Sequence, residues 1–510
     1  MADVRRAPDS PEFQQENATH GGDRARLDSG PLGPVEPPRP VSPSAPVNAR
    51  GFSTLLKNKL FLRLWMAQLI SQTIMNAANY AMIVLVTKES SSALATSGAI
   101  VAFSLPALLF GAPAGALVDR FDRRLVLWVS NVLRAVATVV FIFALIFAKG
   151  TVWPVYALTF FIAMVGQFFT PAEGAAIPRL VHRQELMNAL ALFNITFTLA
   201  QAAGLIVIGP IALLLIPTFR LGGGVTISPI ISLFVIITLL YLVCAALIIS
   251  IPHATLRTPE ASVVMQNGQR RRSDDTRLAG LWKDIVESAK VIRADVALHI
   301  SVWQLTIAGL VISVVAMIAP RFVQIYFHKP AELAALVFIP AGIGLVVGSA
   351  ATPNIARRLK YARTITAGII FLSGSIALLV IGYVTAPYIF GREWWNAWPY
   401  LIAMLTWTFL IGIGLDLVNV PAQTMLQERS PDWVKGRVLA VQIMLLNAIT
   451  VVFVPAIGWI ADHMGLTTAL LVVASIIAIA GMFTVYLGKR AGIANTDLVD
   501  GRRATPEGNA

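Results

Sequence analysis

Three charged side chains belong to long apolar runs of the sequence, where they would lie at membrane depth. They are Asp416 within the run 398–421, Arg134 within the run 124–148, and Glu173 just after the run 152–172. Ionisable groups at such depth are costly to bury, and in membrane proteins they mark ion pathways and proton relays. A carboxyl group removed from water can bind and release protons near neutral pH, so Asp416 is the first candidate for proton coupling. A structural hydrogen bond to a neighbouring polar helix is the alternative.

Glu173 and Arg134 form a second candidate pair, because they lie on two successive runs. An Arg in the middle of a span needs a partner or water, and a nearby carboxylate would supply the partner. Glu173 is close to the end of its run, however, where it can cap the following loop instead. We therefore favour a structural role for both residues and keep proton coupling as the alternative.

Uncharged polar side chains recur on several apolar runs and predict a cavity for a small-molecule substrate. Gln72, Asn76 and Asn79 follow one another at helical spacing in the first run. Polar side chains at membrane depth face the bundle or a water-filled cavity. The remaining candidates for the cavity lining are Asn194, Gln201, Gln304, Asn419 and Asn447. With Trp303, Trp407 and Phe197 they would suit an amphipathic or aromatic solute, although each aromatic residue taken singly is more often a packing residue.

A short, densely charged turn runs from Gly115 to Arg124 between two apolar runs. It holds Asp119, Arg120, Arg123 and Arg124. A charged turn this brief between two membrane-length segments most simply joins two spanning helices. A corresponding turn in the second part of the chain, 357–363, keeps the basic residues but lacks the Asp.

The elements that position these residues are predicted to be membrane-spanning helices. Of the 510 residues, 56% are hydrophobic and 13% charged, whereas soluble domains carry roughly 25% charged residues. Many separate runs exceed the roughly 20 residues that span the hydrocarbon core. We predict an all-α membrane protein with twelve transmembrane helices in two six-helix pseudo-repeats. The spans are 63–87, 93–118, 124–148, 152–172, 187–215 and 229–250, then 297–319, 333–353, 363–386, 398–421, 436–461 and 466–488.

The chain is predicted to divide into five segments around these spans. Residues 1–52, rich in proline and poor in aliphatic side chains, read as a disordered N-terminal tail. Two six-helix bundles, 53–251 and 297–488, flank a linker, 252–296, and a polar tail covers 489–510. Within the linker, 278–294 places its apolar residues on one face, which predicts an amphipathic helix lying along the membrane surface. Pro171-Ala172 and Pro421-Ala422 each precede an Arg at the same spacing, as expected for repeated halves.

The distribution of charge indicates topology rather than nucleic-acid binding. The net charge is +13, and the basic residues gather in every second loop, which places those loops and both termini in the cytoplasm of a cell with an inner, or plasma, membrane. The single cysteine, Cys244, allows no disulfide within the chain and no cysteine-based metal cluster. The sequence has no G-x-x-x-x-G-K-[ST] or H-E-x-x-H motif and no nucleophile beside a base. We expect neither an enzyme nor a bound cofactor or metal.

The G-x-x-x-D-R-x-x-R-R pattern of the turn Gly115–Arg124 resembles the cytoplasmic loop between helices 2 and 3 of the major facilitator superfamily. The stretches 61–72 and 177–181, and Lys435-Gly436-Arg437-Val438, are similar to the branch with siderophore, macrolide and lysophospholipid transporters, except that Lys435 replaces an Arg. The resemblance covers about residues 55–490. It implies two halves that rock about a central cavity.

The resemblance also implies a cytoplasmic gate. In the family, the Asp of this turn lies near the start of helix 11 and pairs with basic residues when the cytoplasmic side is closed; a carboxylate is favoured near a helix N-terminus. We therefore predict a gate of Asp119 with Arg437 or Lys435, next to Arg120, Arg123 and Arg124, that favours the outward-open state. Asp462, in a G-x-x-x-D-x-x-G pattern, is expected to be structural. Gly209-Pro210 is present, but Leu213-Leu214 replace the glycines expected of the drug-antiporter motif.

The function predicted from these observations is secondary active transport by a monomer in the lipid bilayer. The favoured form is proton-coupled efflux of a small amphipathic solute that is drug- or siderophore-like. A lysophospholipid flippase or an importer of the same fold is the alternative. A membrane sensor that transports nothing is a further alternative, which the intact Asp119 turn disfavours.

Overall fold

The computed structural model describes residues 54–90, 92–118, 121–147, 150–182, 184–220, 226–256, 285–431 and 434–490. The predicted tail 1–52, most of the linker and nearly all of the tail 489–510 lie outside these ranges. So do Asp119 and Arg120 of the charged turn. What was predicted for these segments therefore stays a prediction.

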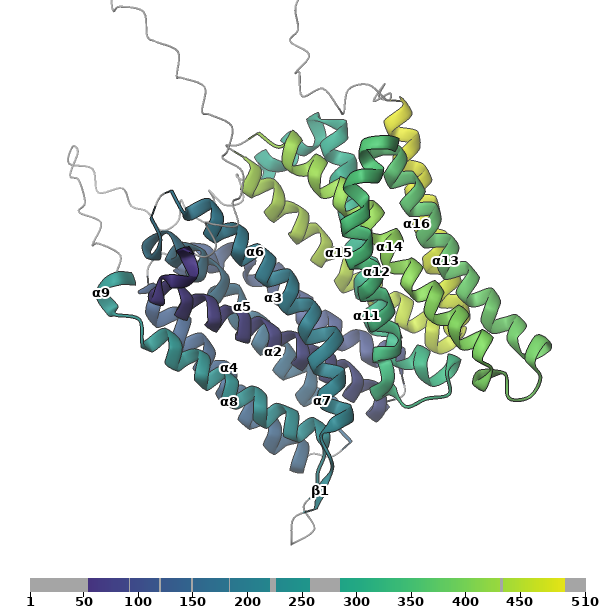
Figure 1. Ribbon diagram of the computed structural model, residues 1–510, viewed down its shortest axis with the longest axis horizontal. Coiled ribbons are helices and arrows are strands. Elements are labelled where there is room, and N and C mark those ends of the chain that lie inside the picture. Colours follow the sequence, from purple (N-terminus) through teal and green to yellow (C-terminus); the bar gives the residue numbers. More distant parts are fainter. Residues whose placement is uncertain are drawn as a thin grey trace, which may run out of the picture. The chain divides into compact units, whose positions relative to one another are not determined.

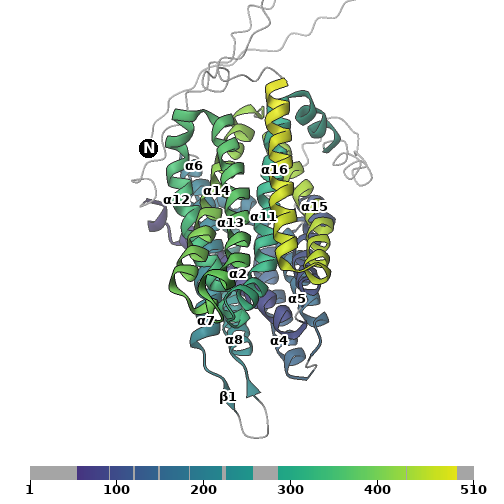
Figure 2. The same cartoon turned by 90° about the vertical axis from the view of Figure 1, so that its right-hand side faces the viewer.

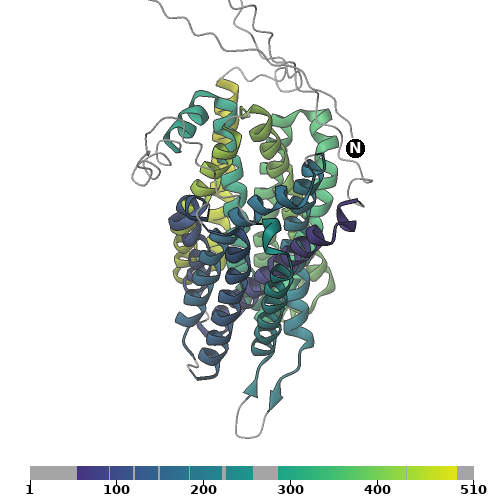
Figure 3. The ribbon, with the colours of Figure 1, turned by 90° about the vertical axis from the view of Figure 1, so that its left-hand side faces the viewer.

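The first half of the described chain, residues 54–256, is helical apart from one short hairpin (Figure 1). Its helices are α2 (Lys59–Ser90), α3 (Ala93–Val118), α4 (Arg123–Phe147), α5 (Trp153–Leu180), α6 (Leu186–Ala202), the π-helix η1 (Ala203–Ile208), α7 (Gly209–Leu215), α8 (Pro229–Ile249) and α9 (His253–Leu256). Strands β1 (Phe219–Arg220) and β2 (Thr226–Ile227) form an antiparallel hairpin between α7 and α8 (Figures 2 and 3).

The second half, residues 285–490, is also helical. After a helical segment at 285–294, it contains α11 (Val296–Tyr326), the 3-10 helix η2 (Ala331–Ala334), α12 (Ala335–Leu359), α13 (Tyr361–Phe390), the 3-10 helix η3 (Trp394–Asn396), α14 (Trp398–Arg429), α15 (Lys435–His463) and α16 (Leu466–Arg490). Several helices extend past the predicted spans, because hydropathy marks only the apolar part of a helix. For example, α11 continues to Tyr326 beyond the predicted end at 319.

Eleven helices of the described residues are long and apolar enough to cross a membrane. The remaining predicted span, the fifth (187–215), corresponds to α6, η1 and α7, which run in sequence from Leu186 to Leu215. The π-helical turn was not predicted. It lies just before Gly209-Pro210 and packs against α2, where a Cβ at Gly204 would lie 2.3 Å from the Thr73 carbonyl oxygen and one at Gly209 would lie 2.9 Å from the Tyr80 ring. The two glycines therefore allow the fifth span to approach the first.

Short polar side chains begin several of the helices. Asn58 accepts hydrogen bonds from the Leu60 and Phe61 N–H groups at 3.1 and 3.2 Å, and starts α2. Asp122 accepts from the Arg124 N–H at 2.8 Å and starts α4, and Asp295 accepts from the Ala297 N–H at 2.8 Å and starts α11. Each cap satisfies donors that have no partner inside the helix.

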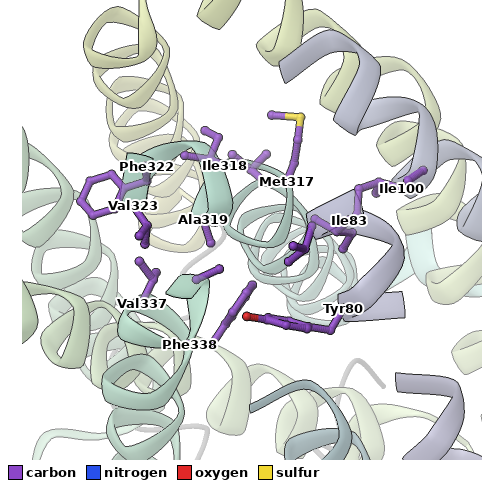
Figure 4. Packing of buried hydrophobic residues seen from close by; sticks show 14 of the residues in the cluster. Tyr80, Ile83, Ile100, Met317, Ile318, Ala319, Phe322, Val323, Val337 and Phe338 are labelled. Carbon is purple, nitrogen blue, oxygen red and sulfur yellow. The ribbon is translucent and has the colours of Figure 1, made fainter. Parts of the chain in front are cut away.

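Successive helices alternate in direction, so the bundle has two ends. We call them the Ser90 end, where α2 and α15 finish, and the Val118 end, where α3 finishes and α15 begins. One buried apolar cluster joins the halves: Tyr80, Ile83 and Ile100 of the first half and Met317, Ile318 and Phe338 of the second belong to it (Figure 4). At the Val118 end, each half has a cluster of its own, one around Val118 and Leu127 and the other around Val434 and Val438.

Candidate functional site

A carboxylate of the second half caps a helix of the first half at the Ser90 end. Asp462, near the end of α15, accepts hydrogen bonds from the Ser92 hydroxyl at 2.6 Å and from the Ala93 and Leu94 N–H groups at 2.9 Å each. These N–H groups open α3 and have no partner within that helix. Arg321 of α11 lies 3.2 Å from the same carboxylate. Charge-assisted hydrogen bonds therefore join the halves, and the positive end of the α3 dipole favours the acid there.

Further contacts reinforce this junction. The Lys88 ammonium lies 2.8 Å from the Glu332 carboxylate, and the Tyr80 hydroxyl donates to the Glu332 carbonyl oxygen at 2.9 Å. A Cβ at Gly458 would lie 2.9 Å from the Ala93 carbonyl oxygen, so a larger side chain would force the helices apart. We call this set the Ser90-end interface: Lys88, Ser92, Ala93, Leu94, Arg321, Glu332, Gly458 and Asp462.

At the Val118 end, two arginines of the predicted gate bond within the first half. Arg123 donates to the Ala175 carbonyl oxygen of α5 at 3.2 Å, and Arg124 donates to the Ile249 carbonyl oxygen at the end of α8. Both arginines thus fix the charged turn to the first half, a role that the sequence did not suggest. Pairing of Asp119 with α15 stays a prediction.

The other side of the predicted gate is engaged by the linker helix. Arg437 lies 3.7 Å from Glu287, and Arg429 lies 4.0 Å from Asp295. Ile292 of the same segment packs in the apolar cluster of Val434 and Val438. The described part of the predicted amphipathic helix therefore contacts the second half with its apolar side. Lys435 begins α15 beside Arg437.

Arg134 is buried among four helices of the first half. Only 3% of the residue is exposed. Its guanidinium donates to the Ser71 hydroxyl at 3.0 Å and lies 5.2 Å from the centre of the Phe169 ring and 5.8 Å from that of Tyr241. A Cβ at Gly166 would lie 3.3 Å from the guanidinium, so glycine provides its space. Among the described residues, the Arg134 guanidinium thus makes two cation–π contacts and one hydrogen bond, and its Nε has no hydrogen-bond partner.

Glu173 is buried on α5, the helix that also supplies Gly166 and Phe169 to Arg134. Its exposure is 5%, and its Oε1 has no hydrogen-bond partner among the described residues. Arg134 interacts with it electrostatically. The two predicted residues therefore share one buried region. Cys244 also borders it, with its thiol donating to the Ala67 carbonyl oxygen at 3.4 Å.

Asp416 lies in the second half, where α12 and α14 approach closely. The Ser349 hydroxyl donates to its carboxylate, and the Asn419 side chain bonds to it as well. A Cβ at Gly348 would lie 2.9 Å from the Asp416 Cβ. This is the hydrogen bond to a neighbouring helix that the sequence offered as the alternative to proton coupling. Coupling through Asp416 stays a prediction.

The predicted cavity residues have different environments. Asn194 and Gln201 are exposed, Gln72, Asn76, Asn79, Asn419 and Asn447 are half-buried, and Gln304 is buried. Asn76 and Asn447 donate to carbonyl groups one turn earlier in their own helices. An apolar cavity of about 50 Å³ lies inside the second half between Val314, Phe322 and Leu379, and none of the predicted amides lines it. Cavity lining by these amides stays a prediction.

Sequence reasoning did not predict the contacts of the Ser90-end interface. The Asp462 motif was recognised but considered structural, and Arg321 and Glu332 were not singled out. The available signal was an acid at the end of a spanning helix. Its partners on α3, however, lie some 370 residues away in the sequence.

The described residues form two helical halves with eleven helices long and apolar enough to cross a membrane. The family model of the Major Facilitator Superfamily matches residues 64–441, so the chain belongs to this superfamily. This confirms the resemblance found from the charged turn, and membership of this superfamily indicates a transporter rather than an enzyme.

Relatives and solved structures are similar at low identity. The uncharacterized MFS-type transporter YfiS of Bacillus subtilis (strain 168) is 22% identical over 430 residues, 83% of this chain and 93% of that protein. Macrolide efflux protein A of Streptococcus pyogenes is 24% identical over 318 residues, 62% of this chain and 72% of that one. The nucleoside transporter NupG aligns with a TM-score of 0.60 at 13% identity, covering 84% of this chain and 99% of that chain. A bacterial homologue of the human lysosomal transporter Spinster, in an inward-facing and unoccupied conformation, aligns with a TM-score of 0.57 at 13% identity. The alignment covers 90% of this chain and 100% of that chain.

Proposed function

We propose that this protein exports a small amphipathic solute, drug- or siderophore-like, across the plasma membrane by proton-coupled alternating access. The Val118 end would face the cytoplasm, because its loops carry most of the arginines and lysines. The Ser90 end would face outward, and both termini would be cytoplasmic. The similarity to a macrolide efflux protein supports efflux and a solute of this kind.

The Ser90-end interface is the observation that carries the proposal. Asp462, Arg321 and the opening of α3 hold the halves together at the proposed outer end, whereas each half has its own apolar cluster at the Val118 end. With this orientation, the described state is closed to the outside, and an exported solute would enter from the cytoplasm. Release would then require breaking the Asp462 contacts.

The cytoplasmic gate would form as the outer interface opens. In that state, Asp119 would pair with Arg437, and Lys435 would contribute a second positive charge. Formation of the gate would offset part of the cost of losing the charged hydrogen bonds at the other end. The two closures would thus alternate during a cycle.

The proposal can be tested with purified protein in liposomes that carry an imposed pH gradient. We would supply a macrolide, a catecholate siderophore and a lysophospholipid separately and measure movement with and without the gradient. Gradient-dependent transport of the macrolide or siderophore against proton flow is the expected result. Transport of the lysophospholipid alone would favour the flippase, and uptake with the protons would favour an importer. Absence of gradient-dependent movement of all three would contradict the proposal and favour the sensor.

A further inference from the structure

We infer that Glu173 is the proton-binding group of the transporter and that Arg134 is its permanent countercharge, an inference that rests on the proposed proton-coupled export. The sequence alone favoured Asp416 for this task. The buried surroundings of the two carboxyl groups reverse that preference.

The first step is the charge of Arg134. A guanidinium stays protonated in proteins, so this cation cannot be removed by neutralisation. It is almost completely buried, with aromatic rings at 5.2 and 5.8 Å and the Ser71 hydroxyl at 3.0 Å. None of these neighbours carries a negative charge. A buried cation is stable only with a compensating charge, which makes an acid in the same region necessary.

Glu173 supplies that acid. Among the described residues, Glu173 is a carboxyl group that interacts electrostatically with Arg134, and its Oε1 has no hydrogen-bond partner there. Ionised, it neutralises Arg134. When it binds a proton, a carboxylate becomes a carboxylic acid and the region gains one positive charge. The exchange needs only a proton from one side of the membrane and its release to the other.

The groups that face Glu173 and Arg134 from the neighbouring helices leave Glu173 as the exchangeable acid. Tyr241 and Cys244 of α8 are neutral near physiological pH, and Ser71 of α2 does not titrate. Arg123 of α4 donates to the carbonyl oxygen of Ala175, two residues after Glu173 on α5, and the charge that acts on Glu173 is that of Arg134. Asp416 differs, because Ser349 and Asn419 already engage its carboxylate between tightly packed helices.

The position of Glu173 suits release to the cytoplasm. It lies seven residues before Leu180, the last residue of α5, which corresponds to about 10 Å along the helix at 1.5 Å per residue. That places it toward the Val118 end, the end where the halves have separate apolar clusters. Ser71, the hydrogen-bond partner of Arg134, precedes Gln72 on α2, so a solute bound at the predicted cavity residues Gln72, Asn76 and Asn79 would contact the helix that Arg134 contacts. A solute that moves α2 would therefore change the Arg134 contacts.

The test separates the proton site from transport. Infrared difference spectra of the reconstituted protein between low and high pH should show a protonated carboxyl band that disappears in Glu173→Gln. The same band should persist in Asp416→Asn and in the matched control Glu428→Gln, an exposed glutamate at the end of α14. Glu173→Asp should restore a band at a shifted pH. If the band persists in a folded Glu173→Gln protein, or disappears in Asp416→Asn, the inference is wrong.

A second readout uses the macrolide as the transport probe. Glu173→Gln should keep macrolide exchange across liposomes without a gradient but lose at least tenfold of its pH-gradient-driven accumulation. Equal gradient-driven accumulation by Glu173→Gln and the unmodified protein would contradict the inference. If the unmodified protein has the Glu173 band but moves no probe with the gradient, the proposed export fails and the proton site stands. If Glu173→Gln does not fold, Glu173→Asp decides, because a coupling acid must shift the pH profile and a purely structural one must not.

Discussion

At both ends of the helix pair α3 and α15, an acid from the end of one helix lies, or is predicted to lie, at the beginning of the other. The two helices exchange roles between the two ends. At the Ser90 end, an acid from the end of α15 caps the beginning of α3. At the Val118 end, the predicted gate places an acid just after α3 at the beginning of α15. Each helix would thus receive its cap from the other, but only one cap would be present at a time. In the proposed mechanism, alternating access would be an exchange of helix caps.

The largest expected effect comes from Gly458→Leu, which would prevent closure of the Ser90 end. The new side chain would meet the Ala93 backbone, where even a Cβ would approach to 2.9 Å. Overpacking against backbone costs about 3 kcal/mol, which corresponds to roughly a hundredfold shift toward the outward-open state. Spin-label distances between Trp153 and Met464 positions should lengthen. Gly374→Leu is the control, because a Cβ there meets no neighbour within 4 Å.

Replacing the capping acid Asp462 should also shift the equilibrium toward the outward-open state, but by a smaller factor than Gly458→Leu. Asp462→Asn keeps one hydrogen-bond acceptor but loses the charge that Arg321 and the start of α3 stabilise. We expect a loss of about 1–3 kcal/mol, or roughly five- to hundredfold more outward-open protein. The same label pair measures it. Unchanged distances would mean that the cap does not hold the end closed.

Removing the predicted acid at the Val118 end should shift the equilibrium the other way, away from the outward-open state. Asp119→Asn should disfavour closure of the Val118 end by about 1 kcal/mol, the scale of a charge at a helix terminus. Under conditions that close this end in the unmodified protein, labels at Leu125 and Leu359 should show roughly fivefold less of the short-distance, closed population. A variant with normal closure and normal transport would show that Asp119 is not part of the gate.

The smallest effect is expected for Lys88→Met. The ammonium side chain is 58% exposed, and solvent-exposed ion pairs contribute between 0 and about 1 kcal/mol. The equilibrium should therefore shift less than about fivefold, and 0.5 M salt should mimic the substitution in the unmodified protein. A shift as large as that of Asp462→Asn would mean that Lys88 contributes as much to closure of the Ser90 end as the Asp462 cap does.

Much of the fold could be predicted from the sequence because the bilayer imposes a strong pattern. Apolar runs fix where helices span, and the charged turn Gly115–Arg124 identifies the superfamily. The π-helical turn before Gly209 was missed because a one-residue change in helical register leaves no mark on hydropathy. Helix ends were also extended in the structure, since polar residues such as those after position 319 continue α11.

The candidate site was predictable in its residue types but not in its pairings. Arg134 and Glu173 were recognised as buried charges. Only the structure shows that Oε1 of Glu173 has no hydrogen-bond partner among the described residues, whereas the Asp416 carboxylate has two. Asp462 lies far along the chain from the α3 residues that it caps, so local pattern could not connect them. The arginines of the charged turn were expected at a gate, whereas Arg123 and Arg124 bond to carbonyl groups of their own half.

The buried thiol of Cys244 makes this protein convenient for spectroscopy. It is the one cysteine in the chain, it is fully enclosed, and it donates to the Ala67 carbonyl oxygen. A thiol in such an apolar setting reacts slowly with water-soluble maleimides and methanethiosulfonates. Cysteine pairs introduced at the two ends can therefore be labelled in the otherwise unmodified chain, without first removing a native cysteine.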